Sequence, residues 1–377
     1  MDKIFEKKHW DTIIIGGGQA GIAAGYHLKK LNEDFLILDE NKRVGDSWRN
    51  RWDSLVLFTP SQHNGLPGFT FPAERGTFAI RDEMADYLEE YVKKFAIPVS
   101  SGVKVNHLSK NNSSDNSTFE ISTSNGIYFS ESVIVATGTN PAPYIPDIAG
   151  KLSEDIHQIH SSSYKNPEMI PPGDVLVIGA GTSGAQIAIE LSRSRKTYKT
   201  FISGNPTPHI PDWLFKYFGG LYWLFISYIL TIKTPIGRKA RKRILSKGTP
   251  LISVSVSDLD AAEVIRLPRT GSVINGYPKL EDGRIIRVSN VIWATGYKPD
   301  FSWIDFNVTD ETGWPATNRG ISKSIPGLYF AGMKFQYSLT SGLIGGVGRD
   351  AEYIAKHIHK LRNRQTGHSY EPQTVTG

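Results

Sequence analysis

The sequence predicts an α/β fold in which one α/β domain is inserted into another of the same kind. Two observations predict it. An apolar strand, a glycine-rich loop and a helix follow one another in DTIIIGGGQAGIAAG and again in DVLVIGAGTSGAQIA. Each unit is followed later by an apolar strand that ends in Ala-Thr-Gly, in SVIVATG and in NVIWATG. The 377 residues are too many for one ordinary core and suit two domains.

Composition narrows the class of protein. Apolar residues make up 39% and charged residues 21%, as in a soluble globular protein, and the net charge of +6 is only mildly basic. The chain has no cysteine, which excludes disulfides, thiolate metal sites and CxxC redox pairs. We expect no metal site and no nucleic-acid partner. The opening MDKIFEKKHWD has no apolar segment, so we expect a cytoplasmic protein without a signal peptide.

The first glycine loop has the form of a dinucleotide-binding loop. A strand over 12–15 leads into Gly16, Gly18 and Gly21, and a helix is expected over 20–31. In this G-x-G-x-x-G pattern the first glycine permits a tight turn and the second lets backbone approach a pyrophosphate. The third lets the helix pack on the strand. The phosphates face the positive end of the helix, so this is a Rossmann-like unit.

The acid after the next strand identifies the dinucleotide. The strand over 35–38 ends at Asp39 and Glu40, and Asp39 lies 18 residues after Gly21. A carboxylate at this strand end holds the ribose hydroxyls of an adenosine. An acid there suits FAD, which carries no 2′-phosphate.

The second glycine loop lacks that acid. Gly179, Gly181 and Gly184 repeat the spacing after a strand over 175–178, but the position that matches Asp39 is Ser203, followed by Gly204 and Asn205. An acid would repel a 2′-phosphate, so its absence permits NADPH. Two such units imply two dinucleotides, and the chain is expected to pass a hydride from nicotinamide to flavin.

The positions of these motifs along the chain predict the domain boundaries. We expect a first FAD-binding part over 1–160, an NAD(P)H-binding domain over 161–285, and a return to the FAD domain over 286–377 that ends in a polar tail. An antiparallel meander is expected between Val99 and Val135, and a helix over 81–96.

The stretch 213–250 is expected to be a helical, aromatic insertion in the NAD(P)H domain. Residues 217–232 carry no charge and are shorter than the about 20 residues of a membrane span. Six basic residues follow between 238 and 247. Two interpretations stay open: a buried lid over the substrate cavity, or peripheral membrane contact through 213–247.

The ordered motifs resemble a known family. GGGQAG, GDSWRNRWDSL, ATG, HSSSY, GAGTSG, ATGY and GLYFAG stand in the order found in class B flavoprotein monooxygenases, and the likeness is greatest to the flavin-containing and YUCCA-like bacterial branch. It extends to about residue 360. The family fingerprint F-x-G-x-x-x-H-x-x-x-[FYW] is present only in its second half, His160 to Tyr164, because Glu154 and Ile156 replace its Phe and Gly.

The resemblance implies a function. The family reduces FAD with NAD(P)H, forms a C4a-(hydro)peroxyflavin with O₂, and transfers one oxygen to a small sulfide, amine, indole-type or carbonyl substrate. Two alternatives stay open: an NAD(P)H oxidase or reductase of the same fold that makes H₂O₂ or passes electrons to a partner, and a membrane-associated flavin sensor with little turnover. The substrate and the oligomeric state stay open, with a homodimer as one hypothesis.

The resemblance also implies contacts to both cofactors. Those to FAD are Gly16, Gly18, Gln19, Ala20, Gly21, Asp39, Glu40, Gly45, Trp48, Val105, Ala136, Thr137, Gly138, Gly332 and Met333. Those to the nicotinamide cofactor are Gly179, Gly181, Thr182, Ser183, Gly184, Ser203, Asn205, Ala294, Thr295 and Gly296, with His160 between the domains. NADPH-specific relatives carry Arg where this chain has Asn205, so we expect NADH to be accepted as well as NADPH.

The candidate residues at the flavin face come from two segments. They are Phe58, Thr59 and Gln62 after the Trp-rich loop, and Phe335, Gln336 and Leu343 near the end of the chain. Many relatives place an Asn beside the flavin where this chain has Phe58. Phe cannot hydrogen-bond a peroxide, so we expect a shorter-lived oxygen intermediate and some release of H₂O₂.

Overall fold

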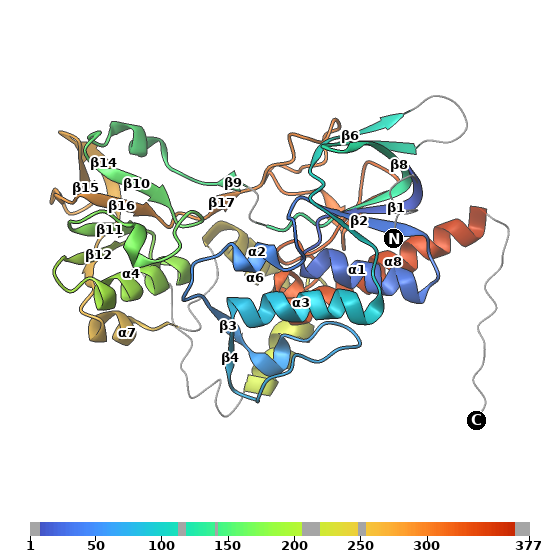
Figure 1. Cartoon of the computed structure of the whole chain (residues 1–377), viewed down its shortest axis with the longest axis horizontal. Helices are drawn as coiled ribbons and strands as arrows, with labels where there is room; N and C mark the ends of the chain where they lie inside the picture. The colour runs from blue at the N-terminus through green and yellow to red at the C-terminus, as the bar shows by residue number, and fades with distance from the viewer. Residues whose placement is uncertain (1–7, 112–117, 140–141, 206–218, 248–253, 366–377) are drawn as a thin grey trace.

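The fold was analysed in a computed structural model, which describes residues 8–111, 118–139, 142–205, 219–247 and 254–365. Two α/β bodies lie side by side and are joined by a pair of short antiparallel strands, β9 (Ala142–Pro143) and β17 (Tyr297–Lys298) (Figure 1). The α/β class with two Rossmann-like domains, one inserted into the other, is therefore confirmed.

The first domain is built on a nine-stranded sheet. Its main path runs β18-β19-β20-β8-β1-β2-β5, with β6 and β7 added beside β8. The strands are β1 (His9–Ile15), β2 (Phe35–Asp39), β5 (Val99–Ser101), β6 (Val105–Asn111), β7 (Thr118–Thr123), β8 (Gly126–Val135), β18 (Thr317–Asn318), β19 (Ile321–Ser322) and β20 (Leu328–Phe330). The central strands β20, β8, β1, β2 and β5 pair in parallel.

Alternate residues of β1 enter two different cores, as the pleat of a strand requires. Ile14 packs with helices α1 (Gln19–Lys30), α3 (Arg81–Phe95) and α8 (Ile344–Gln365), which lie together on one side of the sheet (Figure 1). Ile13 and Ile15 pack on the other side, against the β6–β8 meander. The sheet is thus buried on both faces, which explains its nearly continuous apolar strands.

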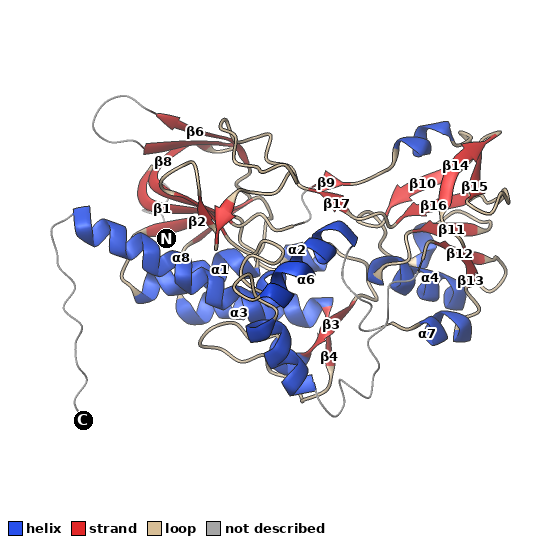
Figure 2. Ribbon diagram, turned by 180° about the vertical axis from the view of Figure 1, so that it is seen from behind, coloured by secondary structure: helices blue, strands red, loops and turns tan. Residues whose placement is uncertain are grey.

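The second domain has a five-stranded parallel sheet in the order β10-β16-β11-β12-β13. Its elements are β10 (His157–His160), β11 (Val175–Ile178), α4 (Thr182–Ser194), β12 (Thr200–Ser203), α7 (Val256–Ala261), β13 (Ile265–Leu267) and β16 (Asn290–Trp293), with a hairpin of β14 (Thr270–Ile274) and β15 (Tyr277–Leu280). Helices α4 and α7 lie on one side of this sheet (Figure 2).

The predicted boundaries at 161 and 286 need correction. Strand β10 ends at His160 and β16 begins at Asn290, and the two pair with each other inside the second sheet. The second domain therefore extends outward past both predicted boundaries, to the crossing strands β9 and β17. Glycine loops and Ala-Thr-Gly turns mark strand ends, but the sequence does not show which sheet a short strand such as β10 joins.

The predicted meander is also only partly antiparallel. Strands β6, β7 and the first half of β8 pair antiparallel, whereas β5 pairs in parallel with β2 in the main sheet. Its polar turn at 112–117 lies outside the described residues.

Outside the sheets, β3 (Val56–Pro60) and β4 (Phe78–Ile80) form a small antiparallel pair, and α2 (Asp46–Arg49) precedes them. The insertion is helical over 219–224, in the π-helical turn η5 (Phe225–Ile229) and in α6 (Pro235–Lys247). Residues 213–218 and 248–250 of the predicted insertion, like the tail after 365, lie outside the described part. In that part, no helix combines the length and the apolar content that a membrane span requires.

Candidate functional site

The first glycine of each loop lies against the backbone of an Ala-Thr-Gly turn. Gly16 has φ +108°, and a Cβ on it would lie 2.6 Å from the carbonyl oxygen of Ala136. Gly179 has φ +118°, and its Cβ would lie 2.2 Å from the carbonyl oxygen of Ala294. No side chain fits at either position, so the repeated tripeptide is the partner of the repeated loop.

Of the other two glycines in each loop, one is packed against backbone atoms and the other faces open space. A Cβ on Gly21 or on Gly184 would lie 1.9 Å from the carbonyl oxygen of the first glycine of its loop. At Gly18 and Gly181, by contrast, an added Cβ meets nothing within 4 Å. These two residues are the N-caps of α1 and α4, which have no side-chain cap and no acid in the first turn. Each helix thus presents free N–H groups to open space, as a diphosphate requires.

The predicted ribose-binding acid Asp39 is buried and already braces the first loop. Its Oδ2 accepts the backbone N–H of Gly17 at 2.8 Å, and its Oδ1 accepts the N–H of Asn41 at 2.8 Å. The carbonyl of Asp39 accepts the N–H of Val103, so the residues leading to Val105 run beside it. Glu40 is exposed. The Asp39 carboxylate thus holds the first glycine loop from the end of β2, the position at which an acid binds ribose hydroxyls in such folds.

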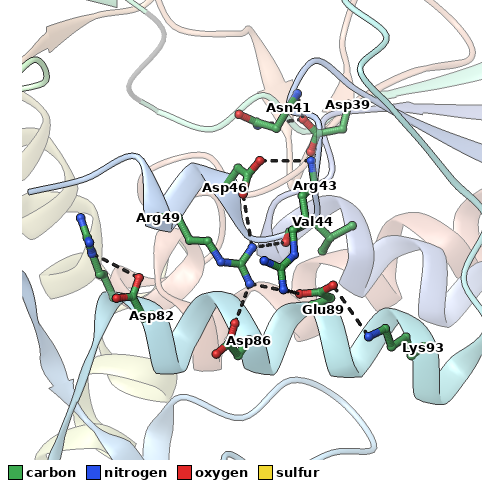
Figure 3. Close-up of polar contacts among 11 residues, drawn as sticks. Asp39, Asn41, Arg43, Val44, Asp46, Arg49, Asp82, Asp86, Glu89 and Lys93 are labelled. Atoms are coloured by element: carbon green, nitrogen blue, oxygen red, sulfur yellow. Dashed lines mark hydrogen bonds and ion pairs between the residues drawn. The ribbon is translucent and has the colours of Figure 1, made fainter. Parts of the chain in front are cut away.

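An ionic cluster that the sequence analysis did not find holds the segment around Gly45 and Trp48. Arg49 donates to Asp86 at 2.6 Å and to Glu89 at 3.1 Å on α3, and also to the carbonyl of Val44 at 2.8 Å (Figure 3). Gly45, at φ +91°, brings its Cα so close to α3 that a Cβ would lie 2.5 Å from the carbonyl of Ala85. The charges are visible in the sequence, but nothing in their spacing shows that Arg43 and Arg49 pair with acids of α3 more than 30 residues away.

His160 joins the two halves of the site at the crossing strands. The N–H of Ser162 donates to Nδ1 of His160 at 3.1 Å, so Nε2 carries the proton and donates to the carbonyl of Gly296 at 3.0 Å. Burial lowers the pKa of His160, which keeps the ring neutral. The same carbonyl accepts the N–H of Tyr144. His160 therefore ties the second Ala-Thr-Gly turn to the linker.

At the second dinucleotide site, the interpretation of Ser203 needs correction. Its hydroxyl donates to the carbonyl of Pro268 at 2.8 Å and lies 2.8 Å from the hydroxyl of Thr270, and the residue is buried. The side chain therefore faces the turn between β13 and β14 and is not available to a ribose. Asn205 is exposed at the end of β12.

The two segments of the predicted flavin face do meet. A Cβ on Gly345, at the start of α8, would lie 2.0 Å from the carbonyl of His63, just after β3. A Cβ on Gly332 would lie 2.7 Å from the Cβ of Ala20 in the first turn of α1. The end of the chain thus returns to the N-terminus of α1, beside the first glycine loop.

The individual flavin-face candidates differ in their surroundings. Thr59 and Phe335 are buried, whereas Phe58 and Leu343 are half-buried. Gln62 is exposed and its Oε1 accepts the N–H of Gly76 at 3.0 Å, so it faces away from a buried site.

Two buried amides in the same region each have one polar atom without a hydrogen-bond partner. Gln336 is buried, and its Nε2 has no hydrogen-bond partner. Asn64, which sequence analysis missed, is fully buried; its amide donates to the carbonyl of Thr59 while its Oδ1 has no partner. Buried polar groups without partners are uncommon and indicate a ligand or water. The roles of all these residues toward a cofactor stay predictions.

Comparisons with known proteins agree with this geometry. Residues 13–212 match the family described as pyridine nucleotide-disulphide oxidoreductase. The chain belongs to this family. It is 41% identical to a Geobacillus kaustophilus protein named "Uncharacterized oxidoreductase CzcO-like", over 92% of this chain and 98% of that protein.

Two monooxygenases are also similar. A "Probable indole-3-pyruvate monooxygenase YUCCA9" of Arabidopsis thaliana is 26% identical over 94% of this chain and 90% of that protein. The structure of a flavin-containing monooxygenase from Stenotrophomonas maltophilia superposes with a TM-score of 0.76 at 25% identity, covering 94% of this chain and 99% of that one. The resemblance to class B flavin monooxygenases is thereby confirmed, and the chain is a flavin-dependent oxidoreductase of monooxygenase type.

A matched pair of glycine variants tests the second loop. Gly179→Ala forces a Cβ into the Ala294 carbonyl at a positive φ, so we expect the free energy of unfolding to fall by about 1–3 kcal/mol. Gly181→Ala adds a Cβ in open space, so stability should hold while NADP⁺ binds more weakly. Urea unfolding and calorimetric titration measure the two effects. Equal stability of the two variants would contradict the packed and open assignments.

Proposed function

We propose that this protein is an FAD-dependent monooxygenase that uses NADPH or NADH to transfer one oxygen atom of O₂ to a small substrate. The observation that carries the proposal is the pairing of two glycine loops with two Ala-Thr-Gly turns in adjoining domains. Each helix N-terminus would hold one dinucleotide, and His160 fixes the second turn at the crossing strands. Such a pair suits hydride transfer from nicotinamide to flavin.

The reaction balances with these partners alone. The nicotinamide gives two electrons as a hydride, a proton comes from solvent, and O₂ is divided between the product and one water. FAD supplies the oxygen-activating chemistry when bound. The protein's own residues bind and orient both cofactors and keep water from the flavin face, where Thr59 and Phe335 are buried and Phe58 and Leu343 partly so.

The substrate class follows from the family. We propose a small sulfide, amine, indole-type or carbonyl compound, and the indole-3-pyruvate monooxygenase among the relatives supports the last two. The cytoplasmic location and the number of subunits stay predictions from the sequence.

One observation favours a second candidate, an NAD(P)H oxidase that releases H₂O₂. The position at which many relatives place Asn beside the flavin is Phe58, which offers no hydrogen bond. The nearby amides, Asn64 and Gln336, each have one unpaired polar atom and are the alternative donors or acceptors.

Rapid-mixing spectroscopy separates the two candidates. The FAD-loaded protein is reduced with NADPH and mixed with oxygenated buffer, and the flavin spectrum is followed. We expect an absorbance band distinct from oxidised and reduced flavin before reoxidation, and a product heavier by one oxygen from ¹⁸O₂ when a substrate is present. Direct reoxidation with one H₂O₂ per NADPH, unchanged across a panel of sulfides, amines, indoles and ketones, would favour the oxidase.

Cofactor preference is expected to be modest because Asn205 replaces an Arg. The ratio of kcat/KM for NADPH and NADH should stay below about a thousandfold in either direction, since one Arg–phosphate pair contributes only a few kcal/mol. Asn205→Arg should raise the preference for NADPH by about tenfold or more. Asn205→Gln, which adds length without charge, is the control. A strict preference in the wild type, or no effect of the added Arg, would contradict this prediction.

A further inference from the structure

The insertion presents an apolar surface to solvent instead of burying it. Six of the fifteen large apolar side chains that are exposed on the described residues lie between 221 and 236. They are Leu221, Leu224, Phe225, Tyr228, Ile229 and Ile236, exposed by 39–66%. Exposed apolar residues normally occur singly, so this cluster indicates a contact surface. We call these six residues the apolar patch. The interpretation of the whole insertion as a buried lid is not supported.

Most of the patch is one side of a well-anchored helix over 219–229, whereas Ile236 lies on α6. Residues 221, 224, 225 and 228 recur at helical spacing and point outward, while the intervening residues pack on the protein. Trp223 stacks on the ring of His63 at 4.3 Å between centroids, and Ile226 is 4% exposed. Arg349 of α8 donates to the carbonyl of Ser227 at 2.8 Å. The outward side chains are therefore held in place on a rigid support.

A basic segment follows the patch along the chain, and three of its cations, Arg238, Arg241 and Lys242, also line a cavity with Met333 and Gln336. Six exposed cations follow on and just before α6: Lys233, Arg238, Lys239, Arg241, Lys242 and Arg243. The sequence has no acidic residue between Asp212 and Asp258. Cations next to exposed apolar side chains match the boundary of an anionic bilayer, where the cations attract lipid headgroups and the apolar side chains insert.

We propose that this surface binds anionic lipid bilayers peripherally, through the apolar patch and the cations of α6. A second copy of the chain is the less suitable occupant, because a symmetric contact would bring two acid-free basic surfaces together. The segment over 219–229 was predicted to belong to the NAD(P)H domain, but it packs on His63 and Arg349 and forms the lower edge of the first domain, drawn in yellow in Figure 1. Neither glycine loop belongs to this surface. Bilayer binding would therefore set where the protein acts, and it does not depend on the proposed function.

The test uses the FAD-loaded full chain and two kinds of vesicle. One is pure phosphatidylcholine and the other is equimolar phosphatidylcholine and phosphatidylglycerol. We expect sedimentation with the anionic vesicles, little with the neutral ones, and a loss of binding as salt rises from about 0.1 M to about 1 M.

Two paired variants separate the apolar and charged contributions. Lys233→Gln with Lys239→Gln should weaken binding to anionic vesicles roughly 25-fold, since each cation near such a surface contributes about fivefold. Leu221→Ser with Leu224→Ser should weaken it about tenfold or more. Ile274→Ser with Ile285→Ser removes exposed apolar side chains from the second domain and should leave binding unchanged.

Several results would overturn the proposal. No sedimentation with anionic vesicles would do so, as would equal binding by the wild type and both paired variants. A concentration-dependent dimer in light scattering that is lost in the Leu221→Ser and Leu224→Ser variant would assign the surface to a second copy. If the leucine variant loses its flavin, the lysine variant decides the outcome alone, because Lys233 and Lys239 are exposed and belong to no buried core.

Discussion

The candidate site depends on one backbone contact that occurs in both domains. In each domain a glycine with positive φ lies directly on the carbonyl of the alanine in an Ala-Thr-Gly turn, Gly16 on Ala136 and Gly179 on Ala294. The contact joins the loop after the first strand to the turn after a neighbouring parallel strand. It leaves the helix N-terminus open and brings the two turns to the carboxyl ends of their sheets, where α/β folds bind ligands. In both domains, only a glycine leaves enough space for this close approach of two backbone segments.

The two dinucleotide-binding units differ at the end of the second strand, where the ribose of the dinucleotide is expected to bind. In the first, buried Asp39 accepts the N–H of Gly17 and adds a negative charge beside the loop. In the second, Ser203 faces the neighbouring turn and Asn205 is exposed. A neutral strand end accepts a phosphorylated or an unphosphorylated ribose, which accounts for the expected use of both nicotinamide cofactors. His160 connects this domain to the other through Gly296 and stays neutral because it is buried.

Local patterns predicted most of this fold, and long-range packing decided the rest. The glycine spacings, β1, β2, β11, β12 and the helices that follow were predicted because short apolar runs between glycines have few alternatives. The boundary strands β10 and β16 were assigned to the wrong domain because a strand of four residues does not specify which sheet it joins. Ser203 was misinterpreted because its partners, Pro268 and Thr270, are distant in sequence. The Arg49 cluster and Asn64 depend on side-chain geometry that spacing alone does not give, and the exposure of 221–236 could not be read from an apolar composition that fits a buried lid equally well.

The central claim is that each glycine loop holds one dinucleotide of its own kind. Nucleotide stoichiometry tests it most directly: the flavin released on denaturation is quantified per chain, and NADP⁺ is titrated calorimetrically into the flavin-loaded protein. The account predicts one FAD per chain and one NADP⁺ site that FAD in excess does not displace. Two FAD molecules per chain, or competition between FAD and NADP⁺ for a single site, would contradict it.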